Sequence, residues 1–203
     1  MIGVLAYGSL ITDPGPELEA VTVDTISGVP TPFRVEFARS SGKRGGAPTL
    51  VPVEEGGSQV QAVIFRVEGS EREIADIVYR REIHAVGSGK TYSDPPADRK
   101  NAVRIARFEG LADFDVVLAT RIAANISPLS AEILADLAIA SARELSDGRD
   151  GISYLIAARA SGIVTLLSPA YERAILDKAA AADLHAALHG IQTEAAERAS
   201  DLA

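Results

Sequence analysis

The first half of the chain carries short apolar runs separated by turn-forming residues, a pattern that predicts strands joined by loops. Residues 1–6 form an apolar run that stops at Gly8, as a buried strand does when it leads into a tight loop. We expect Gly28 and Pro30 to end the next strand, at residues 21–26, because both residues interrupt a strand pattern. The runs that favour further strands are residues 21–26, 33–38, 49–53, 59–67, 101–108 and 114–122.

A helix is predicted to start near residue 71. Ser70 and Glu73 match a capping box, in which a serine before the helix and a glutamate three residues later satisfy each other's backbone N–H groups. Ile74 and Val78 lie four residues apart and share one helical face, and Glu82 is the next position on that face. The pattern therefore places a carboxylate on the apolar stripe of the helix.

After residue 126 the composition becomes alanine-rich and helical. We expect helices near residues 130–145 and 151–160, and one long final helix capped by Ser168 with Pro169 at its first position. Strands followed by helices predict an α+β fold with a mostly antiparallel sheet or barrel. We expect residues 1–125 to form this sheet domain.

Composition and charge narrow the range of partners. The 203 residues carry a net charge of -8, which argues against nucleic acid because phosphate binding needs a basic face. Cysteine is absent, so disulfides, thiolate metal sites and cysteine nucleophiles are excluded. The apolar runs are shorter than a membrane span requires, and no basic segment precedes the first of them. We therefore expect a cytoplasmic protein without a membrane partner.

Tyr7-Gly8-Ser9-Leu10 is the first candidate binding element. Glycine lets backbone and ligand approach closely, and it frees N–H groups to point at an anion. A simple turn at the end of a strand explains the same residues. Ser9 is not the serine of a nucleophile elbow, because Tyr7 and Ile11 stand where the G-x-S-x-G motif has glycines.

Glu82 is the candidate acid/base group. A carboxylate in surroundings of low dielectric constant suits proton transfer near neutral pH. The alternative is a helix-end carboxylate that forms an ion pair with Arg80, Arg81 or Lys90. Together, an anion-holding loop and a half-buried glutamate predict an acid/base enzyme that acts on a small carboxylated substrate.

Two further motifs do not support a ligand. Residues 87–91 approach a phosphate-binding loop, but His84 occupies the position of its first glycine and the segment follows a helix. His185 and His189 lie four residues apart, yet the sequence offers them no third ligand, and a solvated helix face explains them. We therefore expect neither a nucleotide nor a metal ion, and no other cofactor.

These residues resemble the γ-glutamylcyclotransferase-like family, and most closely its ChaC-like branch. The YGSL signature of the family is present at residues 7–10, directly after the first strand, and Arg81-Glu82 matches the Arg-Glu pair that ends the family's helix. The other matching segments, in the family's order, are residues 33–40, 44–46, 60–67 and 150–155. The resemblance covers residues 1–167.

The resemblance implies a fold and a reaction. The fold is a small, mostly antiparallel β-barrel with flanking helices. We expect residues 1–125 to form this barrel domain and residues 126–203 to form a helical extension packed on it, whose part after Ser168 lies beyond the resemblance. The reaction releases 5-oxoproline from a γ-glutamyl amide or peptide such as glutathione, because the substrate's own α-amine attacks its γ-carbonyl. Glu82, by its match to the family's glutamate, would carry the proton from the amine to the leaving nitrogen. No cofactor is implied, because nucleophile and electrophile are tethered in one molecule.

The resemblance also assigns binding residues. The backbone N–H groups of residues 8–10 would hold the glutamyl part of the substrate, and Tyr7 belongs to the same loop. Tyr92 would be the aromatic residue that lines the site. The loop of residues 83–96 is longer and richer in glycine and proline than expected for the family, and its glycines would permit a lid.

Two alternatives stay open beside the cyclotransferase. One is a non-catalytic module that binds a small metabolite or a partner protein, and the other is an enzyme that removes a γ-glutamyl group from a pathway-specific metabolite. If Glu82 points into a cavity beside residues 7–10, catalysis is favoured; if it is locked in an ion pair with Arg80 or Arg81, the binding module is favoured. The alanine-rich final helix can pack on its own chain or on a second one.

Overall fold

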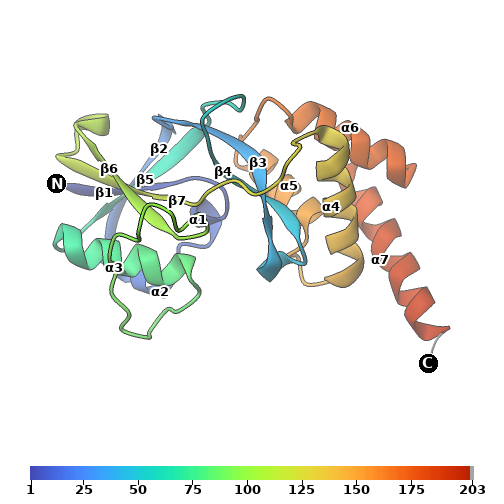
Figure 1. The fold of residues 1–203 in the computed structure, drawn as a ribbon, viewed down its shortest axis with the longest axis horizontal. Coiled ribbons are helices and arrows are strands. Elements are labelled where there is room, and N and C mark those ends of the chain that lie inside the picture. Colours follow the sequence, from blue (N-terminus) through green and yellow to red (C-terminus); the bar gives the residue numbers. More distant parts are fainter. Residues whose placement is uncertain (202–203) are drawn as a thin grey trace. The chain divides into compact units, whose positions relative to one another are not determined.

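The computed structural model describes residues 1–201 and divides into two compact units (Figure 1). Residues 1–32 and 59–123 form the first, which we call the sheet unit. Residues 33–58 and the chain from residue 124 onward form the second, the helical unit. The expected domains, 1–125 and 126–203, stay a prediction, and the two units differ from them by grouping residues 33–58 with the helices.

The sheet unit contains a mixed five-stranded sheet with the strand order β2-β5-β1-β7-β6. The central strand β1 runs antiparallel to β5 and parallel to β7, and the other neighbours are antiparallel. The α+β class is confirmed, but over residues 1–201 the pairings run from one edge to the other and do not close the expected barrel. The bounds of the strands are Ile2–Ala6 (β1), Thr22–Pro30 (β2), Gln61–Val67 (β5), Arg104–Glu109 (β6) and Val116–Arg121 (β7).

The first apolar run of the sequence forms the central strand β1. Val4, Leu5 and Ala6 have no exposed surface. Because successive side chains of a strand point to opposite faces of a sheet, both faces of β1 are covered here. Gly3 is needed for this packing, because a Cβ atom there would lie 2.6 Å from Cγ2 of Ile64 on the adjacent strand. The chain therefore leaves a tightly packed strand, β1, where it enters the loop at Tyr7.

The edge strand β2 is longer than predicted, because it continues through Gly28 and Pro30. Its register with β5 shifts between Ser27 and Val29, so Gly28, with a φ of 78°, is the extra residue of a bulge. Proline is tolerated at an edge, where its missing N–H group removes no bond to a further strand. The prediction of a strand end was wrong because edge and bulge positions accept both residues.

The helix α3 (Glu71–Glu82) has the predicted capping box and bears the candidate glutamate. Its Ile74 and Val78 are fully buried in a core shared with strands of the sheet, and Figure 1 shows α3 beside the strands. Two short helices of the same unit, α1 (Ser9–Thr12) and α2 (Pro16–Val21), were not predicted. They are too short to show a helical period in the sequence.

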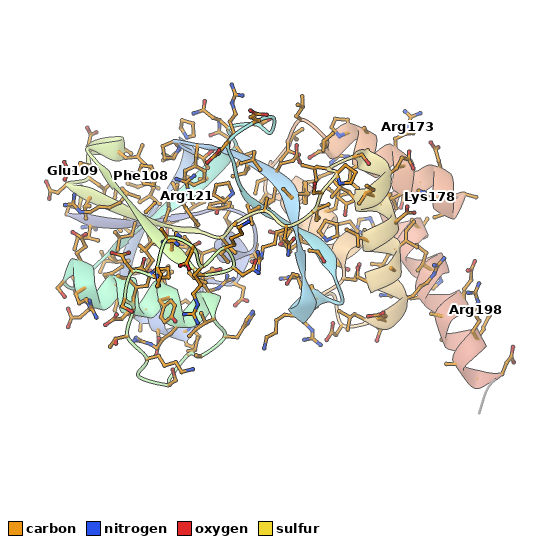
Figure 2. All side chains as sticks on the ribbon, viewed as in Figure 1. Phe108, Glu109, Arg121, Arg173, Lys178 and Arg198 are labelled. Atoms are coloured by element: carbon orange, nitrogen blue, oxygen red, sulfur yellow. The ribbon has the colours of Figure 1, made fainter. Side chains whose placement is uncertain are left out.

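The helical unit combines a two-stranded hairpin with helices. The Phe37 ring on the hairpin packs edge-on against Tyr154 and Tyr171, with centroids 6.1 and 5.4 Å away. Lys178, labelled in Figure 2, forms ion pairs with Glu132 and Asp136 of another helix at 3.3 and 2.8 Å. The elements are β3 (Arg34–Ser41), β4 (Ala47–Val53), α4 (Ala131–Glu144), α5 (Gly151–Ala160), α6 (Ser168–Ala179) and α7 (Leu184–Ser200).

The expected single final helix is two helices. The helix α6 ends at Ala179 and is followed by Ala180, whose φ of 48° is left-handed; α7 begins after Asp183, whose side chain accepts a hydrogen bond from the N–H of Ala186. Ser168 is the first residue of α6 and not its cap; its hydroxyl accepts from the N–H of Thr165. Over residues 1–201, no helix combines the length and apolar character needed to cross a membrane.

A glutamate is buried within the helical unit. Glu36 on β3 has only 1 % of its surface exposed, and its carboxylate accepts hydrogen bonds from the N–H groups of Phe37 and Leu167 at 2.9 and 3.0 Å. The hydroxyl of Thr165 donates to it as well. The carboxylate thereby fastens the loop between α5 and α6 to the hairpin.

Candidate functional site

Contacts at both of its ends hold the loop that follows β1 in place. The hydroxyl of Tyr7 donates to the carbonyl of Thr120 on β7 at 3.0 Å, and Leu10 is buried in the core of the sheet unit. Gly8 lies between them with φ 61° and ψ −137°, a positive φ that favours glycine. The four residues of the YGSL sequence therefore form a bend whose shape depends on the glycine.

The backbone of this loop turns at once into α1. The N–H of Ile11 donates to the carbonyl of Gly8, and the N–H of Asp13 donates to that of Ser9. The first N–H groups of a helix find no carbonyl within it, so the N–H groups of Ser9 and Leu10 have no acceptor inside α1. This geometry is compatible with the anion-holding role that was predicted for residues 8–10.

Glu82 ends α3 on the buried side of the helix. Val78 and Ile74, one and two turns earlier on the same face, have no exposed surface, and the Glu82 side chain is 14 % exposed. This low exposure agrees with the predicted position on the apolar stripe, and the acid/base role of Glu82 stays a prediction. The carboxylate is not isolated, because its Oε1 accepts from Nη1 of the neighbouring Arg81 at 2.8 Å.

The guanidinium of Arg81 also reaches the loop. Its Nη2 donates to Oγ of Ser9 at 3.3 Å, and Nε and Nη2 donate to the carbonyl of Asp13 at 3.1 and 2.7 Å. The Arg81 side chain is itself only 16 % exposed. One guanidinium thus joins the candidate glutamate to the YGSL loop, over 70 residues earlier in the chain. The sequence named Arg81 as a possible ion-pair partner and as half of the family's motif, but nothing in it indicated the contact with Ser9.

The ion pair of Glu82 with Arg81 is present, as the binding module predicts. Arg81 also contacts Ser9 of the YGSL loop, but the cavity beside residues 7–10 into which Glu82 should point for catalysis stays a prediction. A cavity of about 340 Å³ beside α3 is lined from Glu68 to Arg80 and by Val21 on α2, without Glu82.

The segment after Glu82 is fastened through the other arginine of the pair. Nε of Arg80 donates to Glu17 on α2 at 2.8 Å, and the second oxygen of Glu17 accepts from the N–H of Gly87 at 2.9 Å. Nη1 of Arg80 donates to the carbonyl of Lys90. The hydrogen bond from Arg80 holds the pKa of Glu17 below its ordinary value, and the bond from Gly87 acts in the same direction. Arg80 and Glu17 thus hold residues 87–90, the middle of the predicted lid.

Tyr92 lies in the core of the sheet unit. Its ring packs against Tyr79 of α3 at 5.6 Å, and its hydroxyl donates to Asp94 at 2.6 Å and accepts from the N–H of Ile105 at 3.1 Å. Burial raises the pKa of Tyr92, and the hydrogen bond to Asp94 raises it further. These contacts connect the long loop to α3 and β6, and the predicted role of Tyr92 in lining the site stays a prediction.

The described part of the chain contains no cluster of side chains that could bind a metal ion. Among residues 1–201, no three His, Asp or Glu side chains lie close enough together to hold a metal ion. His185 and His189 are exposed on α7. The groups available for chemistry at the loop are thus a carboxylate, a guanidinium, a hydroxyl and backbone N–H donors.

Comparisons with known proteins do not assign the chain to a family. No family model matches the sequence, and no curated protein is significantly similar to it.

Proposed function

We propose that this protein is a γ-glutamylcyclotransferase-like enzyme that releases 5-oxoproline from a γ-glutamyl amide or peptide. The observation that carries the proposal is the contact of Arg81 with both Glu82 and Ser9, which puts a glutamate and the YGSL loop at one place in the sheet unit. The small barrel implied by the resemblance is part of the same proposal.

In the proposed reaction, a bond forms between the α-nitrogen of the substrate and its γ-carbonyl carbon. The amide bond between that carbon and the leaving nitrogen breaks, and a five-membered lactam results. Glu82 takes a proton from the attacking amine and returns a proton to the leaving nitrogen, so no proton is gained or lost overall. The charged carboxylate held against Arg81 is the form that accepts the first proton.

The loop supplies binding and orientation. Backbone N–H groups at the start of α1 suit a carboxylate or the oxygen of the attacked carbonyl, because both carry negative charge during the reaction. Holding nucleophile and electrophile in a productive geometry supplies much of the rate enhancement in an intramolecular reaction. In this mechanism the side chains and backbone of the protein suffice, and no cofactor takes part.

The binding module remains the second candidate, and one observation favours it. The ion pair with Arg81 occupies one oxygen of Glu82, as a structural carboxylate would. A pathway-specific deprotection enzyme would use the same residues with a different leaving group, so it differs only in the substrate.

The test is 5-oxoproline release from glutathione, γ-glutamyl-alanine and a γ-glutamyl amine. We expect turnover of at least one of them, with a decrease in kcat of about 10²- to 10⁴-fold in Glu82→Gln, which keeps the shape and removes the base. Glu19→Gln removes an exposed carboxylate from α2 and is the matched control, expected to keep wild-type activity. Full activity of Glu82→Gln would eliminate the proposed mechanism. A well-folded protein that turns over none of the three substrates would support the binding module.

A further inference from the structure

Arg81 has more partners at the site than an ordinary helix-end arginine. Its Nη1 donates to Glu82, its Nη2 donates to Ser9 and Asp13, and its Nε donates to the same Asp13 carbonyl. The carboxylate of Asp13 is 3.7 Å from Nη2. All three guanidinium nitrogens therefore donate hydrogen bonds, and the acceptors belong to two separate segments of the chain.

This arrangement distinguishes the two oxygens of the candidate base. Oε1 of Glu82 receives the guanidinium, whereas Oε2 receives no hydrogen bond from the described residues. The Oε2 atom is therefore the oxygen with free capacity for a substrate proton. Rotation of the carboxylate away from this orientation would break the 2.8 Å bond to Arg81.

We propose that Arg81 is the positioning residue of the site: it holds Glu82 with Oε2 available and sets the distance between that oxygen and the YGSL loop. This inference rests on the proposed function and deepens it. Arg81 acts through Glu82 and Ser9 and does not itself touch the reacting atoms. Lysine cannot replace it, because a single ammonium lacks the fork that reaches two segments at once.

The first test compares Arg81→Lys, Arg81→Gln and the control Arg72→Gln, which removes an exposed guanidinium from the first turn of the same helix. With the γ-glutamyl substrate that the wild type turns over fastest among the three named above, we expect both Arg81 variants to lose kcat on the order of 10²-fold, with KM nearly unchanged. Arg72→Gln should match the wild type. If Arg81→Lys keeps wild-type kcat, charge alone suffices and the positioning role is wrong.

The second test needs no activity. A double-mutant cycle of Arg81→Gln and Ser9→Ala, followed by urea unfolding, measures whether the two residues are coupled. We expect the double variant to lose less stability than the two single variants together, whereas Arg72→Gln combined with Ser9→Ala should be additive. An additive Arg81–Ser9 cycle would overturn the inference. Absence of 5-oxoproline release by the wild type would overturn the proposed function instead, and the cycle would still decide whether Arg81 joins the helix to the loop.

Discussion

Two glutamates with little exposed surface, one in each unit, differ in their hydrogen bonds. Glu36 on β3 is 1 % exposed, and its hydrogen-bond donors are two backbone N–H groups and a hydroxyl. Glu82 at the end of α3 has a 14 % exposed side chain, and its one hydrogen-bond donor within the described chain is the guanidinium of Arg81. Glu36 is thus the more deeply buried of the two, and both of its carboxylate oxygens accept hydrogen bonds.

The comparison shows that burial of a carboxylate is a poor guide to chemistry by itself. Both oxygens of Glu36 accept from groups that belong to the fold, so this side chain has a structural use and little capacity for a substrate. Glu82 keeps an oxygen without a donor beside a glycine-shaped loop. The pattern of satisfied and unsatisfied oxygens therefore separates a structural glutamate from a catalytic candidate.

Glu36→Ala should have the largest effect on stability. It leaves the N–H groups of Phe37 and Leu167 without their acceptor in the interior, and each such loss costs about 1–3 kcal/mol. We expect the free energy of unfolding, measured with urea, to fall by about 2–5 kcal/mol. Glu36→Gln keeps one acceptor oxygen and should lose less. Equal stability of Glu36→Ala and wild type would show that the buried carboxylate has no structural role.

Glu82→Gln should have a much smaller effect on stability than on activity. The amide oxygen of glutamine can still accept from Arg81, which also keeps the carbonyl of Asp13 and the hydroxyl of Ser9 as partners, so we expect a loss of about 1 kcal/mol. The same urea titration, run beside that of Glu36→Ala, checks this value. A loss as large as that of Glu36→Ala would place both glutamates in the structural class.

Glu17→Gln should have the smallest effect, because this carboxylate is paired near the surface. We expect a decrease in the free energy of unfolding of about 0.5 kcal/mol near neutral pH. The pKa of Glu17 is lowered in the folded protein, so its contribution is present above its ordinary pKa of 4.5 and is lost as the pH falls below that value. Urea titrations at pH 7 and below pH 4 should therefore show that the difference between variant and wild type disappears in acid.

The same substitution also tests the attachment of the loop after Glu82. The N–H of Gly87 donates to Glu17, so its hydrogen exchange should become faster in Glu17→Gln while the amides of β1 keep their protection. Unchanged exchange at Gly87 would mean that Arg80 alone holds the loop, through the carbonyl of Lys90.

Much of the sheet unit could be predicted from the sequence, because its signals are local. The run before Gly8 forms β1, Ser70 and Glu73 form the capping box, and the four-residue spacing from Ile74 puts Glu82 on the buried face. Each of these features depends on residues within a few positions of one another.

The features that could not be predicted depend on contacts between distant segments. Residues 33–38 predicted only a strand, and the loop that bears Thr165 and Leu167 explains why Glu36 is buried on it. The contact of Arg81 with Ser9 likewise joins segments that only the fold brings together. The break between α6 and α7 occurs at Ala180, a residue that by itself favours helix, so no local signal marked it.

The order in which the two units occur along the chain has a consequence for biosynthesis. The ribosome delivers β3 and β4 early, but the side chains that cover Phe37, those of Tyr154 and Tyr171, are translated more than a hundred residues later. At 5–20 residues per second, the nascent chain carries this apolar hairpin without its cover for about ten seconds, while the sheet unit on either side of it is completed. We expect a chaperone to have its largest effect during this interval, when the apolar hairpin is uncovered.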